Sequence, residues 1–392
     1  MSSRFLSPSA ALLLLLALAI PVTHLTAAEL HLTSPRNYEV IQRNAKNSGK
    51  IIVTGAFSGL FPPSSNVQAR LLASNTLAAD WIPLSRLQHT ATGFQGEVDA
   101  PAGGWYRLEV RILGESPTLI LQGFVEHVGV GEVFVICGQS NSANYGDEKQ
   151  ESKSGLVSAF TGKEWIICRD PQPGAGGNGG SFIPPFGDAI ASQLKIPVGM
   201  IALGVGATSI REWLPAGAFF PNPPTLTNHV ILHANKKWQS DGVIFDRLMG
   251  TLKPQGTNGF RAILWHQGES DANQKDDTRT LRGSEYQRLL QQLILSSRDE
   301  TGWSCPWFVA QASYHSPDDP GSPEIRAAQR ALWQSGVALQ GPDTDSLSSN
   351  LRSNGGKGVH FSGAGLRAHA QLWADKVLPW LQSQVPSAAT SP

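Results

Sequence analysis

The stretch that decides the fold is Glu132-Val-Phe-Val-Ile-Cys137, followed directly by Gly138-Gln139-Ser140-Asn141. Val, Ile and Phe dominate the first run, and a short apolar run of this kind is typical of a buried strand. Gly138 ends the run, and a serine follows it two residues later. In an α/β protein, reacting groups collect at the carboxyl ends of the strands. A serine on a sharp turn there can present its hydroxyl to a substrate, so Ser140 is a candidate nucleophile.

The pattern of apolar and polar residues differs between the two sides of this strand. Residues 29–126 contain short runs in which apolar and polar positions alternate, with Gly, Pro, Asn and Ser between them. This pattern predicts a small all-β sandwich domain without helices. In residues 127–384 strand-like runs alternate with helical periodicity. That pattern predicts a second domain, in which a largely parallel sheet is covered on both faces by helices. The polar tail, residues 385–392, is expected to fray.

The apolar runs of the second region place the individual elements. Strands are predicted at residues 132–137, 165–168, 198–203, 261–266, 307–311 and 337–340. Helices are predicted at residues 187–194, 284–298, 324–335 and 363–381. The stretch 170–187 is dense in glycine and proline, so we expect an exposed loop near the site, with the character of a lid.

The first residues predict a secretory leader. Arg4 precedes an apolar run over residues 10–20, and Thr26-Ala27-Ala28 offers a small-residue cleavage site. The run is too short to remain as a membrane span, so residues 1–28 are expected to be removed and the mature protein to be secreted or periplasmic, without a membrane partner. Lys plus Arg and Asp plus Glu number 31 each, which leaves no electrostatic argument for nucleic-acid binding.

The cysteines and histidines indicate neither a disulfide scaffold nor a metal site. Cys137, Cys168 and Cys305 form no Cys-x-x-Cys pair, and the first two end apolar runs. Buried free thiols are therefore favoured over the single disulfide that three cysteines allow. His229 and His233 are four residues apart and could share a helix face, but no third ligand accompanies them. We expect neither a metal nor an organic cofactor.

An esterase serine needs a base and donors for the oxyanion of the tetrahedral intermediate. His360 is the favoured base, because it lies between a glycine-rich turn and a helix N-cap. His369 falls on the expected polar face of the last helix and should be solvated. The candidate oxyanion donors are the backbone N–H groups of Ser140 and Gly206 and the side-chain amide of Gln267. All three follow predicted strands.

Four segments together resemble the sialate O-acetylesterase-type members of the SGNH hydrolase superfamily. They are Gly138-Gln139-Ser140-Asn141, Gly204-Val-Gly-Ala-Thr-Ser-Ile-Arg-Glu-Trp213, His266-Gln-Gly-Glu-Ser-Asp271 and Val359-His-Phe-Ser-Gly-Ala-Gly365. The similarity covers about residues 127–384. It implies a flavodoxin-like three-layer α/β/α fold and a secreted carbohydrate acetylesterase. By motif match, Ser140 is the nucleophile, His360 is the base, and Ser140, Gly206 and Gln267 form the oxyanion hole.

One position departs from the pattern of that family. Many members have Asp three residues before the histidine, where it orients the imidazole, and this chain has Lys357. An amine cannot accept the Nδ1–H, and a nearby positive charge disfavours the imidazolium. Glu269 is the first candidate for a substitute acid, ahead of Asp343 and Asp345 at another strand end. A Ser–His dyad, with Glu269 only bracing the Ser140 loop, stays open.

The sequence therefore predicts a secreted two-domain esterase that removes acetyl groups from a sugar or glycan through an acyl-serine intermediate. Asn141, Arg211 and Trp213 are expected to contact the substrate, since they belong to the motifs and tryptophan rings suit sugar faces. One alternative is a deacetylase of acetylxylan or another polysaccharide. The other is a carbohydrate-binding pseudoenzyme that has lost its acid.

Overall fold

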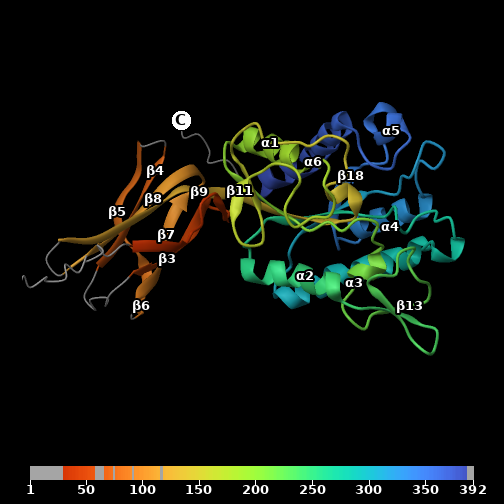
Figure 1. Cartoon of the computed structure of the whole chain (residues 1–392), viewed down its shortest axis with the longest axis horizontal. Helices are drawn as coiled ribbons and strands as arrows, with labels where there is room; N and C mark the ends of the chain where they lie inside the picture. Colours follow the sequence, from red (N-terminus) through yellow and green to blue (C-terminus); the bar gives the residue numbers. More distant parts are fainter. Residues whose placement is uncertain (1–29, 58–65, 74–75, 91, 115–117, 386–392) are drawn as a thin grey trace, which may run out of the picture.

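The computed structural model describes residues 30–57, 66–73, 76–90, 92–114 and 118–385 (Figure 1). The predicted leader lies outside these residues, and so does nearly all of the predicted tail. Within the described part of the chain, no helix is both long and apolar enough to cross a membrane. The chain has a mixed α/β fold, with a large mixed sheet and a separate small antiparallel sheet.

The described residues of the N-terminal region form strands and no helix, in keeping with their alternating pattern. The small antiparallel sheet has the order β1-β3-β7-β6. Its strands are β1 (Leu30–Ser34), β3 (Ser48–Phe57), β7 (Gly93–Pro101) and β6 (Ser85–Thr90). The other strands are β2 (Glu39–Gln42), β4 (Asn66–Ala73), β5 (Thr76–Pro83) and β8 (Gly103–Leu113), and they belong to the large sheet. Buried apolar side chains from both sheets form one core, including Ile51, Val53, Val67, Leu108 and Val128.

A single strand joins the two regions. β9 (Leu119–Gly138) is 20 residues long, and the predicted strand 132–137 is only its last part. Its first part pairs with β8, and its last part lies between β12 (Val198–Ala202) and β16 (Ala262–His266). The boundary that we placed after residue 126 thus falls inside a continuous strand.

The C-terminal part of the large sheet carries the site. Its strand order is β11-β10-β12-β9-β16-β17-β18, and neighbouring strands are parallel except for the pair β10 and β11. The remaining strands are β10 (Val157–Phe160), β11 (Trp165–Ile167), β17 (Trp307–Gln311) and β18 (Leu339–Asp343). The predicted strand 132–137 is part of β9, and four further predicted strands have ends within one or two residues of the observed ones. The sixth, β18, begins two residues later than predicted. β10 was not predicted.

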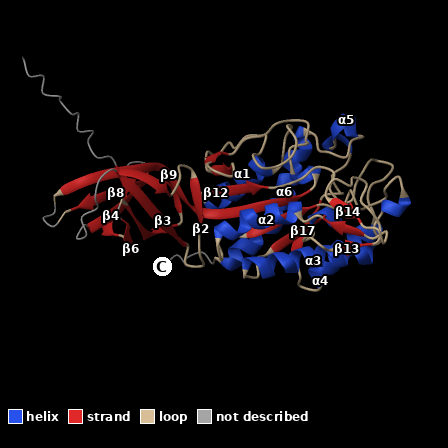
Figure 2. Cartoon of the chain, turned by 60° about the horizontal axis from the view of Figure 1, so that its bottom comes forward, coloured by secondary structure: helices blue, strands red, loops and turns tan. Residues whose placement is uncertain are grey.

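Helices pack on both faces of these strands (Figures 1 and 2). Phe134 and Ile136 of β9 share a core with α1 (Ile183–Leu194) and α6 (Gly363–Gln384). The residues of β9 that alternate with Phe134 and Ile136 face a second core. That core is formed with α2 (Val243–Leu252), α3 (Gly283–Thr301) and α4 (Pro323–Gln334). Successive side chains of a strand point to opposite faces, so one apolar run can serve both cores. α2 and the short helix α5 (Ser353–Gly356) were not predicted; α1, α3, α4 and α6 were, within about four residues.

Candidate active site

Ser140 follows the end of β9, at the start of the short 3₁₀ helix η1 (Ser140–Ser142). The turn before it needs glycine, because Gly138 has φ 125° and an added Cβ would lie 2.0 Å from the carbonyl oxygen of His266. The side chain of Ser142 donates to the Gln139 carbonyl at 2.7 Å, which holds the turn. Ser140 is only 5% exposed, so its hydroxyl lies in a largely water-excluded position at the strand end.

Two backbone N–H groups beside Ser140 are available to a substrate oxygen. The Val205 N–H donates to the Gly138 carbonyl at 2.9 Å, which places the loop after β12 against the loop after β9. Gly206 packs so tightly on Tyr145 that an added Cβ would lie 2.3 Å from the phenolic oxygen. Among the described residues, the N–H groups of Ser140 and Gly206 have no hydrogen-bond acceptor. An oxyanion hole needs donors of this kind, and the assignment of these two N–H groups to the oxyanion stays a prediction.

The side-chain amide of Gln267 has other partners. It is fully buried, and its Nε2 lies 2.7 Å from Asp271 Oδ2 and 3.2 Å from both Gln139 Oε1 and the Thr208 carbonyl. Its Oε1 accepts from the Tyr286 hydroxyl at 3.1 Å. Two amide hydrogens thus already face three acceptors. Donation to an oxyanion stays a prediction, and it requires that one of these bonds be given up.

Glu269 lies beside the nucleophile turn. Its Oε1 accepts from the Asn141 amide at 2.8 Å, and that amide also donates to the Val359 carbonyl at 3.2 Å. Asn141 therefore connects the turn that holds Ser140 to the loop that holds His360. The second oxygen, Oε2, is buried and has no partner among the described residues. Glu269 thus braces the Ser140 loop and keeps one acceptor oxygen free.

His360 is half-buried, and its ring centroid lies 5.4 Å from that of Tyr145. Burial lowers the pKa of the His360 imidazole below its ordinary value, the charges of Glu269 and Asp147 oppose this shift, and that of Arg352 adds to it. Lys357 is exposed and is not among the charges that shift this pKa. A neutral imidazole is the form that can accept a proton from a serine.

The two aspartates that we ranked behind Glu269 have partners elsewhere. Asp343 forms a two-pronged ion pair with Arg326, with contacts of 2.7 and 2.8 Å. Asp345 accepts from Ser313 Oγ at 2.8 Å, from the backbone N–H groups of Ser313 and Tyr314 at 2.8 and 3.0 Å, and from Arg326 at 2.9 Å. Asp345 therefore holds the loop after β17, and Asp343 is paired with the first turn of α4.

Two residues expected to contact the substrate are buried in the protein instead. Arg211 is fully buried, and its guanidinium donates to Asp271 and to the carbonyls of Asn222, Pro223 and Arg279. Trp213 is 1% exposed, and its Nε1 donates to Thr208 Oγ1 at 2.9 Å. These two predictions find no support, because neither side chain reaches a surface that a sugar could contact. Asn141, in contrast, lies in the site.

The structure also bears on the expectations for the other histidines and for the cysteines, and packing corrects the one for His369. His369 is fully buried rather than solvated, because its face of α6 packs against the sheet; its Nε2 accepts from Trp373 at 3.0 Å. His229 and His233 flank the strand β14 (Val230–Leu232) and share no helix. Among the described residues, no group of three or more His, Cys, Asp or Glu side chains could hold a metal ion. The three cysteines are free and buried, as expected.

The glycine-rich stretch 170–187 packs against the loop that follows Ser140 and supports it, whereas we expected an exposed lid. The Asn144 side chain donates to the carbonyls of Gln172 and Ala175 and accepts from the Gln172 N–H at 2.6 Å. The Asp170 carboxylate is buried and accepts from Ser181, through both its N–H and its hydroxyl, at 2.6 Å. The last five residues of the stretch, 183–187, already belong to α1.

Two residues that hold the site escaped the sequence reasoning. Arg352 is buried, and its guanidinium donates to the carbonyls of Leu347, Thr344 and Val359, so it fixes the loop of His360. Burial lowers the pKa of Arg352 to about 10. Asp271 accepts from Ser209, Arg211 and Gln267 and joins two of the motifs. Asp271 lies in a quoted motif, so a signal existed for it; Arg352 has none.

One family model and several solved structures are similar to this chain. A family model described as carbohydrate esterase, sialic acid-specific acetylesterase, matches residues 130–379. No curated protein matches. A carbohydrate acetylesterase from Xanthomonas citri is similar in structure, with a TM-score of 0.48 and 16% identity over 86% of this chain and 72% of that one. A carbohydrate esterase family 2 enzyme with a carbohydrate-binding domain, from Corynascus thermopiles (Myceliophthora fergusii), has a TM-score of 0.37 and 14% identity over 90% and 99%.

The family match spans well over half of the chain and includes all four motifs. The protein is accordingly a carboxylic-ester hydrolase that acts on acetylated carbohydrates. The chain belongs to the carbohydrate esterase family of sialic acid-specific acetylesterases.

Proposed function

We propose that this protein is a secreted O-acetylesterase of sialate type that works through an acyl-serine intermediate. The observation that carries the mechanism is the position of Ser140, at the end of β9 beside two backbone N–H groups without acceptors. The Asn141 amide holds the His360 loop next to it through the Val359 carbonyl. Secretion is proposed from the N-terminal apolar run alone.

The chemistry follows from these positions. Ser140 Oγ attacks the acetyl carbonyl while His360 accepts the serine proton, and the oxyanion is bound by the Ser140 and Gly206 N–H groups. His360 then gives that proton to the leaving sugar oxygen, which departs as a free hydroxyl group. In the second half, His360 takes a proton from a water molecule that attacks the acetyl-serine, acetate leaves, and the proton returns to Ser140 Oγ. Among the described residues no hydrogen bond or ion pair joins Glu269 to His360. Glu269 stays the proposed orienting acid, because its Oε2 is a buried acceptor without a partner there and its negative charge raises the pKa of the His360 imidazole.

The finer reading of the architecture belongs to the same proposal. We assign the parallel strands, with helices on both faces, to the flavodoxin-like three-layer fold of SGNH hydrolases. We assign the strands before β9 to a β-sandwich domain, because two sheets share one apolar core there. The domain ranges 29–126 and 127–384 remain our proposal, although β9 runs across their boundary.

Acetate release from a panel of O-acetylated sialic acids and acetylated xylo-oligosaccharides tests the substrate class. We expect release from the sialic acids; release from the xylo-oligosaccharides alone would indicate the polysaccharide deacetylase. Mass spectrometry of protein quenched during turnover should find one acetyl group on the peptide with Ser140. Steady turnover without any acetylation of wild-type protein, together with full activity of Ser140→Ala, would contradict the acyl-serine mechanism.

A further inference from the structure

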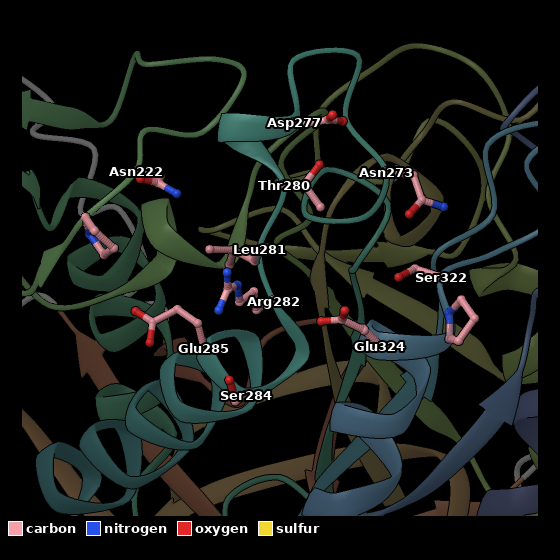
Figure 3. Close-up of a pocket in the computed structure, with 12 residues that line it drawn as sticks. Asn222, Asn273, Asp277, Thr280, Leu281, Arg282, Ser284, Glu285, Ser322 and Glu324 are labelled. Atoms are coloured by element: carbon pink, nitrogen blue, oxygen red, sulfur yellow. The ribbon is translucent and has the colours of Figure 1, made fainter.

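A hollow of about 930 Å³ lies at the same end of the parallel strands as Ser140. It is formed by the loops that follow β13 (Phe219–Phe220) and β16 and by the starts of α3 and α4, as Figure 3 shows. Its volume falls within the range of sites for small organic ligands. None of the residues assigned to the acetyl-transfer chemistry lines it.

Four side chains that line the hollow have no hydrogen-bond or ion-pair partner among the described residues. They are Asn222, Asp277, Arg282 and Ser284. Their free groups include an amide, a carboxylate, a guanidinium and a hydroxyl, so both donors and acceptors are offered. The hydroxyl groups of a sugar can each donate and accept, and a sugar therefore matches such a mixed lining.

The charges around the hollow favour an uncharged ligand. Asp277, Glu285 and Glu324 contribute carboxylates, and Arg282 is the free cation facing them within this lining. The Glu285 carboxylate is paired with Arg288 at 2.7 Å, and Glu324 Oε2 accepts from the Gly283 N–H at 2.8 Å. A ligand with a negative charge would meet more carboxylates than cations here.

The hollow is physically connected to the catalytic loop. Asn273, which lines it, is four residues from Glu269, so their Cα atoms lie at most about 14 Å apart. The Asn273 amide donates to Asp319 at 2.6 Å, Asp319 is 2.6 Å from His315 Nδ1, and His315 Nε2 is 2.6 Å from the Glu269 carbonyl oxygen. Through these contacts His315 connects the loop that lines the hollow to the backbone of Glu269.

We propose that this hollow is a subsite for an uncharged sugar linked to the acetylated one, so that the enzyme takes its substrate as part of an oligosaccharide. The inference rests on the proposed function, because it assumes that the acetyl ester is cleaved at Ser140. It applies to a sialic acid at the end of a neutral glycan and equally to an acetylated sugar within a neutral chain.

The test compares free and linked substrates in two pairs: O-acetylated N-acetylneuraminic acid with O-acetylated sialyllactose, and acetylated xylose with acetylated xylotriose. In the pair that the enzyme hydrolyses, we expect kcat/KM for the linked sugar to exceed that for the free sugar about tenfold or more, mainly through KM. Asp277→Ala and Arg282→Ala should each reduce this ratio several-fold, because hydrogen bonds to charged groups are the strong ones. Lys275→Ala, an exposed change in the same loop but outside the lining, should leave the ratio as it is.

Two results would overturn the subsite: a wild-type ratio near one in every hydrolysed pair, or a ratio that neither Asp277→Ala nor Arg282→Ala changes. A failure of the subsite can be told apart from a failure of the proposed function, because sugar binding can be measured without acetate release. If no acetate is released from any substrate, binding of lactose and xylotriose to the wild-type protein is measured by ligand-observed NMR. Binding that Asp277→Ala removes would support the subsite even then, and absence of binding would refute it.

Discussion

The two sides of the active site differ in how completely their polar groups are bonded. Around Asp271, the carboxylate accepts from Ser209 at 2.5 Å, from the Ile210 N–H at 2.8 Å and from Gln267 at 2.7 Å. Around Glu269, in contrast, Glu269 Oε2 and His266 Nδ1 are buried without partners among the described residues. Leaving buried polar groups unpaired is costly, so the second side is the one that a substrate, water or proton must complete.

The histidine next to Glu269 illustrates this incompleteness. Thr344 Oγ1 donates to the Gln311 carbonyl at 2.8 Å, so the His266 Nε2 at 2.9 Å must be the donor to that oxygen. A neutral His266 then has its lone pair on Nδ1, which lies 3.8 Å from Glu269 Oε1. Burial lowers the pKa of His266, so the neutral form is favoured there. We therefore propose that the Asp271 side is a scaffold and that the Glu269 side is the working side, where the chemistry takes place.

The largest expected effect comes from Ser140, where the two sides meet. Ser140→Ala should lower kcat for acetate release about 10³-fold or more, because no other group can form the acyl intermediate. The melting temperature should change little, since the turn is held by Ser142 and Gln139. Acetate release and thermal unfolding measure the two quantities, and a folded variant with wild-type kcat would contradict the assignment.

The variant Gln267→Ala distinguishes a structural role of Gln267 from a role in binding the oxyanion. If the amide turns to the oxyanion during the reaction, kcat should fall roughly 10²- to 10³-fold with a smaller change in KM. Because Asp271 and Gln139 would lose a buried donor, the free energy of unfolding should also fall by about 1–3 kcal/mol. Denaturant unfolding gives the second quantity. A loss of stability without a loss of kcat would place Gln267 wholly in the scaffold.

Glu269→Gln tests the working side directly. As the orienting acid, Glu269 stabilises the His360 imidazolium, so its amide variant should lower kcat by roughly 10²-fold. Asp343→Asn and Asp345→Asn serve as matched controls and should affect kcat far less, because Arg326 and Ser313 hold those carboxylates. If all three variants kept kcat near the wild-type value, the enzyme would work as a Ser–His dyad.

The smallest effect concerns pH. The base must be neutral, and burial lowers the pKa of His360, so the acid limb of kcat/KM should have its midpoint below the ordinary histidine value of about 6.5. The negative charge of Asp147 raises that pKa, so Asp147→Asn should move the midpoint further down by a fraction of a pH unit. A pH profile with p-nitrophenyl acetate measures both, and a midpoint moving upward would contradict this electrostatic account.

The sequence predicted the strand ends well, because local apolar runs and glycine breaks determine where a strand stops. It could not predict which face a motif residue presents: Arg211 is buried because carbonyls from Asn222 and Arg279, distant in sequence, accept its donors. The length of β9 was also hidden, since its glycines suggest an interruption. Gly131 is needed there because an added Cβ would lie 1.8 Å from the Pro197 carbonyl oxygen. Such close approaches depend on tertiary packing.

The unbroken strand β9 has a practical consequence for anyone who wants the catalytic part alone. Cleaving the chain after residue 126 would cut through the middle of the ladder and remove β8, the partner of Val128 and Val130. Both valines are fully buried, so the cut would open an apolar seam at the edge of the catalytic sheet. Such a fragment invites aggregation through the exposed strand edge. The N-terminal strands should therefore be retained whenever the esterase is expressed, trimmed or fused to another protein.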